Sequence, residues 1–150
     1  MVHLTPRPLH ADDPVQAHIA RVYAEFGLEF DLDFEDDLQD AVGSDRTGAF
    51  GVVEGPPGST SRIWATAGVL PHGSTRIIKR IYVAAEARRL GLARQLLRLA
   101  AAWGDFPRTE LWSDVRFRSA HRLYLSEGFQ PGPVRVLEDP DRSVERSFWR

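Results

Sequence analysis

The segment Arg88-Arg89-Leu90-Gly91-Leu92-Ala93 is a basic, glycine-containing turn in front of a helix with an apolar stripe. As a plain connection, Gly91 would supply a backbone conformation that other residues avoid, and the arginines would be solvated. As an anion site, free backbone N–H groups, the positive end of the helix dipole and nearby guanidinium groups would hold a phosphate. The lysine and Ser/Thr of a nucleotide P-loop are missing, so the turn alone does not decide between these readings.

A second group with chemical potential lies in the segment AHRLYLSEGF, where Ala120, Leu123 and Tyr124 recur at helical spacing before Gly128. Tyr124 is either a core aromatic residue on an amphipathic helix or a phenol that can give a proton to a leaving group. The chain has no cysteine, which excludes disulfides, thiolate metal sites and an acyl-cysteine intermediate. Any acyl transfer would therefore be direct or would use an oxygen nucleophile.

The elements that position these residues follow from hydrophobic periodicity and turn signals. We expect a short edge strand in 3–10, helices in 12–27 and 33–42, strands in 48–54, 62–70 and 74–83, a long helix ending near Gly104, a strand in 108–113, a helix in 117–128 and two strands within 135–150. In the long helix, the predicted buried side is Leu92, Leu96, Leu99 and Trp103, with Ala93, Leu97 and Ala100 beside it. This order predicts one mixed α/β domain over residues 1–150.

Composition narrows the class of protein. The chain has 150 residues, 43% of them hydrophobic, and a formal net charge of −2, which is typical of a globular protein with a real core. Because the net charge of the chain is not positive, the composition does not indicate a nucleic-acid-binding protein. The N-terminus has no signal-peptide pattern, and no stretch approaches the ~18 apolar residues that span a bilayer, so we expect a cytoplasmic protein that binds no membrane.

The strand, the basic glycine turn and the later Leu-Tyr helix together resemble the GNAT superfamily, which are acetyl-CoA-dependent N-acetyltransferases. The family signature Q/R-x-x-G-x-G/A matches Arg88 to Ala93, and A-x-x-L-Y-x-x-x-G-F matches Ala120 to Phe129. The resemblance implies a mixed, mostly antiparallel central sheet flanked by about four helices. It is specific for the cofactor and silent on the acceptor.

The resemblance also implies roles for individual residues. The pantetheine arm of acetyl-CoA would pair with the end of the fourth strand, and its pyrophosphate would lie on the basic turn. Tyr124 would lie near the cofactor sulfur and protonate the departing thiolate. The implied cofactor-binding residues are Ile81, Tyr82, Val83, Arg88, Arg89, Leu90, Gly91, Leu92, Ala93 and Arg94.

Three departures from the family pattern concern chemistry. Ile77 stands where many members have a glutamate that serves as general base, and Phe117 stands where many have an asparagine that bonds the cofactor. The middle of the turn, Arg89-Leu90, is bulkier than is common. Glu54, His72 and Asp114 are alternative bases, but their positions at strand ends indicate solvated loop residues, so none enters the predicted catalytic set.

Other polar groups have simpler interpretations. The acidic segment 29–40 lacks the glycine and glutamate of an EF-hand, and a solvated helix face is the first reading. Because the first two helices of the family usually wall the acceptor site, a cationic acceptor is the second reading. The five histidines have no metal-ligand spacing, His121 is expected on the outer face of its helix, and no metal is predicted. Trp64 and Trp112 are expected to pack within strands.

Taken together, these features predict an N-acetyltransferase that moves an acetyl group directly from acetyl-CoA to a small-molecule or peptide amine in a ternary complex. A homodimer is compatible with this prediction. The rival prediction is an acyl-CoA-binding module or sensor that has lost catalysis, and Ile77 is the residue that supports it. A structural domain without a cofactor would require both motifs to be accidents.

Overall fold

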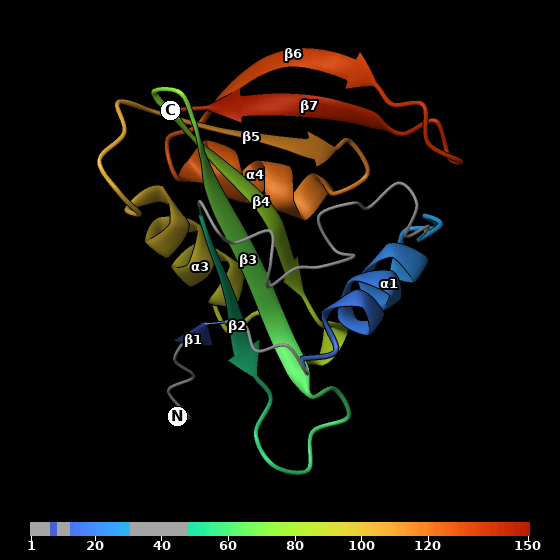
Figure 1. Ribbon diagram of the computed structural model, residues 1–150. Helices are drawn as coiled ribbons and strands as arrows, with labels where there is room; N and C mark the ends of the chain where they lie inside the picture. The colour runs from blue at the N-terminus through green and yellow to red at the C-terminus, as the bar shows by residue number, and fades with distance from the viewer. Residues whose placement is uncertain (1–6, 9–12, 31–47) are drawn as a thin grey trace.

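A computed structural model describes residues 7–8, 13–30 and 48–150 of the chain. Its centre is a seven-stranded sheet in the order β1-β2-β3-β4-β5-β7-β6 (Figure 1). The strands are β1 (Arg7–Pro8), β2 (Ala49–Glu54), β3 (Ile63–His72), β4 (Thr75–Val83), β5 (Arg108–Asp114), β6 (Gln130–Val136) and β7 (Val144–Trp149). β4 and β5 are parallel, and all other neighbouring strands are antiparallel. The predicted mixed, mostly antiparallel sheet is therefore confirmed.

The described residues form three α-helices, α1 (Val15–Glu25), α3 (Leu92–Ala101) and α4 (Arg118–Ser126), and one short 3-10 helix, η3 (Ala85–Ala87). The expectation of about four flanking helices is thus too high for this part of the chain. The helix expected in 33–42, and with it most of the acidic segment 29–40, lies outside the described residues. The order of all other elements agrees with the prediction.

The helices cover the two faces of the sheet unequally. Leu97 of α3 and Tyr124 of α4 share one hydrophobic cluster with Ile78 of β4, so α3 and α4 pack on the same face. Ile19 of α1 packs with Val52 of β2 in a separate cluster. Because successive strand residues point to opposite faces, α1 covers the other face. We call these the α3/α4 face and the α1 face.

The long helix buries a slightly different stripe from the one predicted. Leu92, Leu96, Leu97 and Ala100 are buried. Leu99 is 52% exposed, so its assignment to the buried side is wrong. Gly104 and Gly128 follow α3 and α4 with φ values of +67° and +89°, which is the left-handed geometry that commonly ends a helix at glycine.

A buried arginine caps the end of α3. Arg76 of β4 is 5% exposed and donates hydrogen bonds to the carbonyl oxygens of Trp103 (2.5 Å) and Gly104 (3.1 Å) and to Oγ1 of Thr109 (2.7 Å). Its guanidinium group also lies over the Phe106 ring, 5.3 Å from the centroid. The negative end of the helix dipole and the two carbonyl groups favour a cation at this place.

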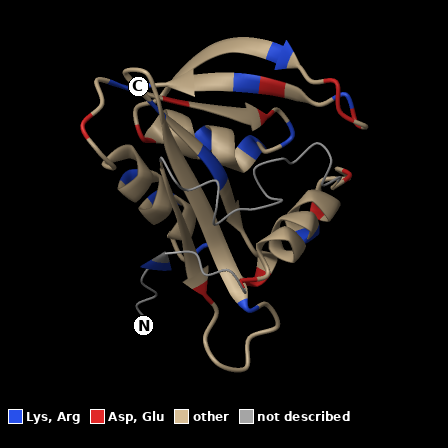
Figure 2. Cartoon of the chain, viewed as in Figure 1, with Lys and Arg blue, Asp and Glu red and all other residues tan. Residues whose placement is uncertain are grey.

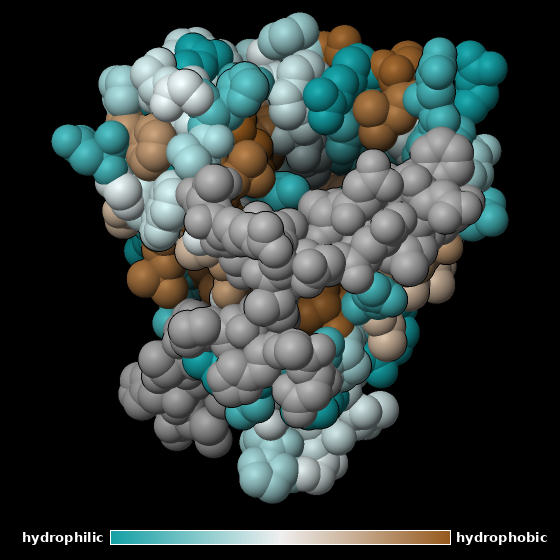
Figure 3. All heavy atoms as spheres, viewed as in Figure 1, coloured by the Kyte–Doolittle hydropathy of each residue, from teal (hydrophilic) through white to brown (hydrophobic). Residues whose placement is uncertain are grey.

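The C-terminal hairpin starts earlier than the sequence indicated. β6 begins at Gln130, not near Arg135, and it includes Pro131 and Pro133. These prolines are tolerated because β6 is at the edge of the sheet, where one side of the strand needs no partner. Val134 and Val136 are 46% and 59% exposed. Figure 3 shows apolar surface next to hydrophilic surface at the upper right, where β6 ends in Figure 1.

Candidate active site

The central strands β4 and β5 run together for only part of their length. Their parallel pairing covers four residue pairs, from Thr75 with Arg108 to Ile78 with Leu111. Beyond this point, among the described residues, β4 pairs with β3 alone and β5 with β7 alone. Figure 1 shows the two strands diverging from their common start. The sheet therefore opens between the C-terminal halves of its two central strands, and we call this opening the strand gap.

A β-bulge lies at the start of the strand gap. Thr66 of β3 pairs with Tyr82 and Gly68 pairs with Lys79, so that two residues of β4, Arg80 and Ile81, stand opposite the single residue Ala67. Arg80 has φ +60°, which is unusual for a residue with a side chain. The buried Thr66 holds it there by donating a hydrogen bond from Oγ1 to the Arg80 carbonyl (2.8 Å). The bulge changes the alternation of β4 and leaves backbone groups unpaired.

The backbone of β4 beyond the bulge faces the strand gap at alternate residues. The Ala84 N–H donates to the Trp64 carbonyl (2.8 Å), which makes this a hydrogen-bonded pair of the antiparallel ladder. Because such pairs alternate, Tyr82 also bonds to β3, whereas Ile81 and Val83 direct their N–H and C=O groups away from it. The Arg88 guanidinium donates to the Val83 carbonyl (3.4 Å), in agreement with this direction. Of the three residues predicted at this place, Ile81 and Val83 present backbone groups to the gap.

The side chain of Tyr82 belongs to the α1 face instead. Its hydroxyl lies 3.3 Å from that of Tyr23 on α1, and Arg80 donates a hydrogen bond to the Tyr23 hydroxyl (3.1 Å). The buried His18, also on α1, lies with Nε2 3.2 Å from the Tyr82 carbonyl. Burial lowers the pKa of His18, so the imidazole is neutral and Nε2 carries the donated hydrogen. These contacts fix α1 against the end of β4.

The basic turn leads from β4 into α3. Arg88 is extended, Arg89 has φ +64° and Gly91 has φ +78° directly before the first residue of the helix, Leu92. No side chain caps the start of α3, and the first helical hydrogen bond runs from the Gln95 N–H to the Gly91 carbonyl (3.0 Å). The N–H groups of residues 92–94 thus have no partner within the helix. An added Cβ at Gly91 would meet no atom within 4 Å, so the glycine answers a backbone need and not a steric one.

The side chains of the turn are not equally available. The Arg88 guanidinium forms an ion pair with the Glu25 carboxylate at the end of α1, at 2.6 Å. Arg89 and Leu90 are exposed, Leu90 to 59%. Ala93 is half-buried. The predicted turn residues are therefore together at one end of the strand gap, with backbone donors, one paired arginine and one exposed arginine.

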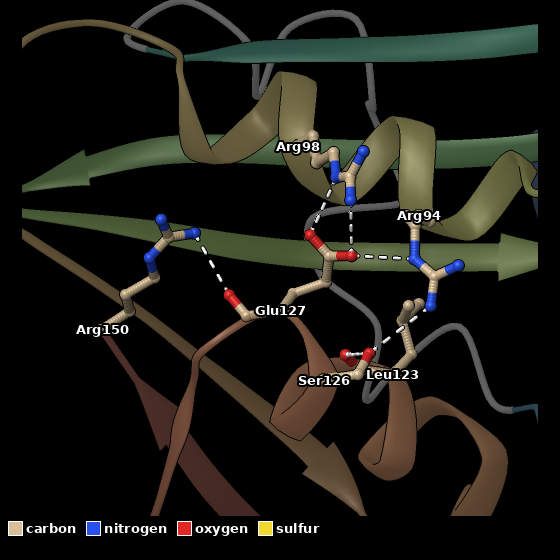
Figure 4. A network of polar contacts seen from close by, with 6 residues as sticks. All are labelled: Arg94, Arg98, Leu123, Ser126, Glu127 and Arg150. Carbon is tan, nitrogen blue, oxygen red and sulfur yellow. Dashed lines mark hydrogen bonds and ion pairs between the residues drawn. The ribbon is translucent and has the colours of Figure 1, made fainter.

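Arginines of α3 connect this helix to α4. The Glu127 carboxylate lies 2.8 Å from Nε of Arg94 and 2.8 Å from Nε of Arg98, and Arg94 is also 3.5 Å from the Ser126 hydroxyl (Figure 4). The two guanidinium groups hold the pKa of Glu127 below its usual range, the hydrogen bond from Arg98 being the main cause. Figure 2 shows basic positions on both helices. Arg94, a predicted cofactor residue, thus already has an acidic partner.

Tyr124 lies on α4, on the α3/α4 face, near the C-terminal ends of β4 and β5. Its side chain is 5% exposed and packs with Phe129 and Phe148. Burial raises the pKa of Tyr124 well above its usual range, the nearby Tyr82 adds to this effect, and a hydrogen bond with the Ser113 side chain opposes it. The phenol is thus protonated at any physiological pH and lies beside the last residues of β5. Both sequence interpretations of Tyr124, core aromatic and proton donor, are compatible with this place.

Of the three alternative bases, Glu54 and His72 are solvated as the sequence indicated, and Asp114 is not. Glu54 is exposed and bound to Arg7 (2.6 Å), and His72 is exposed. Asp114, expected in solvent, is only 6% exposed, and its Oδ2 is buried without a hydrogen-bond partner. His121 is not on an outer face: its ring packs on Phe148 with centroids 4.7 Å apart, and burial lowers its pKa. Sequence reasoning missed both, because their burial arises where α4 folds back on β5.

The described residues include one further cavity beside α1. A cavity of about 220 Å³ lies between α1 and the segment 84–86, with Ser61 and Thr60 on its far side. Within residues 7–8, 13–30 and 48–150, no group of three or more His, Asp or Glu side chains could hold a metal ion. In the same ranges, no helix is long and apolar enough to cross a membrane.

A sheet that opens between two parallel central strands, beside a glycine turn at an uncapped helix start, defines an acetyltransferase-like α/β fold. The family model described as an acetyltransferase (GNAT) domain matches residues 48–131. This is more than half of the chain, and the chain belongs to the GNAT acetyltransferase family. No curated protein sequence matches the chain significantly.

Solved structures agree in fold. An acetyltransferase of the GNAT family from Staphylococcus aureus Mu50 has a TM-score of 0.81 at 18% identity, over 99% of this chain and 98% of that chain. An acetyltransferase from Streptococcus agalactiae has a TM-score of 0.76 at 18% identity, over 98% and 97%. A spermidine N-acetyltransferase from Vibrio cholerae, solved with CoA and spermine, has a TM-score of 0.66 at 17% identity, over 98% and 94%. At these identities the likeness establishes a shared fold.

Proposed function

We propose that this protein is an N-acetyltransferase that moves an acetyl group from acetyl-CoA to a primary amine by direct transfer in a ternary complex. The observation that carries the proposal is the strand gap. The N–H groups at the start of α3, which have no partner within the helix, and Tyr124 of α4 both lie beside it. Family membership supports the donor, and the Vibrio cholerae spermidine N-acetyltransferase with the same fold supports an amine acceptor.

The residues present fit acetyl-CoA. Uncapped N–H groups at a helix start suit a pyrophosphate, and the outward N–H and C=O groups of Ile81 and Val83 suit a chain of amide groups. We propose that Gly91 to Arg94 hold the phosphates through the backbone, with Arg88 and Arg89 adding charge, while Leu90 and Leu92 shape the turn. Tyr82 contributes by fixing α1 to the strand. Acetyl-CoA supplies an activated acyl group and a thiolate leaving group.

Two groups of the chain then assist the reaction at the acetyl carbon, one at its oxygen and one at its sulfur. Because the N–H of Ile81 points away from β3 toward the strand gap, it is placed to stabilise the carbonyl oxygen on which negative charge collects. Tyr124 donates a hydrogen bond to the departing sulfur. A phenol whose pKa is raised is a weaker acid than a thiol with a pKa of about 8.5. The phenol proton therefore moves to sulfur only as the phenol oxygen takes a proton from the nitrogen that has attacked the carbonyl carbon. The C–S bond breaks, and the products are the amide, the thiol and a neutral phenol.

A second candidate, a catalytically weak acyl-CoA-binding module, is favoured by one observation. Ile77 lies on the α1 face beside Glu110 of β5, and no carboxylate occupies its own position. The amine must be neutral to attack, and its unperturbed pKa is about 10 for a lysine-like group, so a missing base slows the reaction.

Turnover separates the two candidates. The purified protein is incubated with acetyl-CoA and a panel of amines, including spermidine and a peptide with a free N-terminus, and thiol release and acetylated product are both measured. We expect product that depends on the amine. Acetyl-CoA binding without any acetylated product would favour the binding module, and the absence of acetyl-CoA binding would refute both.

A further inference from the structure

Asp114 ends β5, where the chain turns into α4. Its backbone carbonyl accepts a hydrogen bond from the Phe117 N–H (3.1 Å), and its Oδ1 accepts one from the Arg116 N–H (2.8 Å). These contacts account for one half of the side chain. The other oxygen, Oδ2, is buried and has no hydrogen-bond partner among the described residues. A buried carboxylate oxygen without a partner is costly, which makes this position a place where a ligand donor would be stabilising.

The ionisable groups near Asp114 are Glu145, Arg116 and His121. Glu145 of β7 is paired directly opposite, and its carboxylate is already bound by Arg135, at 2.8 and 3.0 Å. Among the ion pairs of the described residues, Asp114 has one cationic partner, Arg116, whose Nε is 3.9 Å from Oδ1. This contact is long and lies at the oxygen that is already hydrogen-bonded. Among the residues that the structure describes, Oδ2 therefore has no hydrogen-bond donor and no ion-pair partner.

The place of Asp114 in the sheet relates it to the strand gap. Leu111 faces α3 and α4, so residues at even positions of β5, including Asp114, face the α1 side. Trp112 lies on the same face as Asp114 and Glu145, because Arg135, the partner of Glu145, lies 4.0 Å over its ring. Ser113, next to Asp114, bonds Tyr124 on the opposite face. Asp114 and Tyr124 thus flank the same end of the gap from the two faces.

We propose that Oδ2 of Asp114 binds an ammonium group of the acceptor other than the amine that is acetylated, so that the enzyme selects acceptors with a further positive charge over neutral or anionic ones. The inference rests on the proposed function and names the substrate class of that same site. An ammonium group brings three N–H donors and a positive charge, which satisfy a lone carboxylate oxygen by a charge-assisted hydrogen bond. A neutral acceptor lacks the charge, and an acidic one is repelled.

The test is amine binding to the protein loaded with CoA, which cannot transfer an acetyl group. Spermidine is titrated calorimetrically into the wild type, D114N and E145Q at low and moderate salt. D114N keeps an oxygen for the Arg116 N–H and removes the charge, while E145Q removes one charge from the opposite position on the same face. We expect D114N to weaken spermidine binding about tenfold to a hundredfold and E145Q to change it less than threefold.

A second variant and a second measurement keep the outcomes distinct. Thermal unfolding shows whether D114N is folded. If it is not, D114S takes its place, because serine also has an oxygen that can accept the hydrogen bond of the turn, and it should weaken spermidine binding to the same extent. Equal binding in D114N and wild type, an equal loss in E145Q, or no spermidine binding by the wild type would each overturn the proposal. If Asp114-dependent binding occurs but acetyl-CoA gives no acetylspermidine, the ammonium site stands and the proposed function fails. If D114N forms acetylspermidine with the KM of the wild type, the proposed function stands and the ammonium site fails.

Discussion

The Glu25 carboxylate at the end of α1 lies 2.6 Å from the Arg88 guanidinium at the start of the basic turn. One end of the proposed cofactor site is thereby connected to α1. The arginine that would meet a pyrophosphate already has a counter-ion, and the pair is partly exposed, with 41% and 31% of the two side chains accessible. Such a pair contributes little to the free energy of unfolding, on the order of 0–1 kcal/mol. Its effect should therefore be sought in the affinity for acetyl-CoA.

We therefore expect Glu25→Gln to bind acetyl-CoA about two- to fivefold more tightly than the wild type at low salt, because a negative charge beside the phosphates is removed. The gain should shrink at 0.5 M salt. Glu25→Asp keeps the charge and is the control. Weaker binding by Glu25→Gln in calorimetry would instead mean that Glu25 positions Arg88 for the phosphate.

Gly91 permits a matched pair of substitutions. Its φ of +78° is one that Asn and Asp tolerate better than other side chains, and an added Cβ meets no atom within 4 Å. Gly91→Asn and Gly91→Asp should therefore fold with similar melting temperatures. Only Gly91→Asp brings a negative charge to the start of α3, so its Kd for acetyl-CoA should rise about tenfold or more over that of Gly91→Asn. Equal affinities would remove the pyrophosphate from this turn.

Tyr124→Phe keeps the packed ring and deletes the hydroxyl. We expect near-normal acetyl-CoA affinity and a single-turnover rate that is lower by about a hundredfold to ten-thousandfold, the usual contribution of a positioned proton donor. The variant also leaves the Ser113 hydroxyl without its partner, so Tyr124→Phe/Ser113→Ala serves as the control for that defect. A wild-type rate of acetyl transfer would return Tyr124 to a purely structural role.

Buried histidines predict how stability depends on pH. Burial lowers the pKa of His18 and of His121, so the folded protein keeps both imidazoles neutral while the unfolded chain binds protons below its usual pKa of about 6.5. Their stabilising effect is complete above that pH and is lost as the pH falls toward the folded pKa. Urea unfolding at pH 7.5 and pH 5.5 should show a loss that is smaller in His18→Asn than in the wild type. The same loss in both would exclude His18 as its source.

The buried Arg76 predicts a stability effect far from the strand gap. Arg76→Met removes a cation that satisfies two carbonyl groups at the end of α3, and we expect about 2–4 kcal/mol of destabilisation. Arg108→Met, at an exposed arginine of β5, is the control and should cost well under 1 kcal/mol. Acetyl-CoA affinity of the folded Arg76→Met protein should be unchanged. A loss no greater than that of the control would show that the cap is dispensable.

Much of the fold was accessible from the sequence because it depends on local patterns. Alternating apolar residues located β2 to β5, and the 3.6-residue period with terminal glycines located α3 and α4. The early start of β6 was missed because Pro131 and Pro133 argue against a strand, and only the edge position makes them acceptable. Leu99 was misplaced because two neighbouring stripes of one helix are apolar, and the sheet decides which one is buried.

The site was less accessible. The turn at Gly91 has a local signature, but the bulge at Arg80 has none, since a threonine 14 residues away holds a non-glycine residue at positive φ. The burial of Asp114 likewise arises from the return of α4 onto β5, which sequence spacing does not encode. The ion pair of Arg94 with Glu127 joins residues 33 positions apart, and the sequence had indicated only a cofactor-binding role for Arg94.

The short parallel seam between β4 and β5 divides the sheet into two antiparallel leaves, β1 to β4 and β5 to β7, connected by four residue pairs. Amide hydrogens next to the seam should then exchange with solvent through a hinge-like opening that leaves each leaf intact. A ligand bound in the strand gap contacts both parts of the sheet and therefore restrains this opening for as long as it is bound. Hydrogen exchange at the C-terminal halves of β4 and β5 should slow together when acetyl-CoA is added, while exchange in the β6–β7 hairpin stays the same.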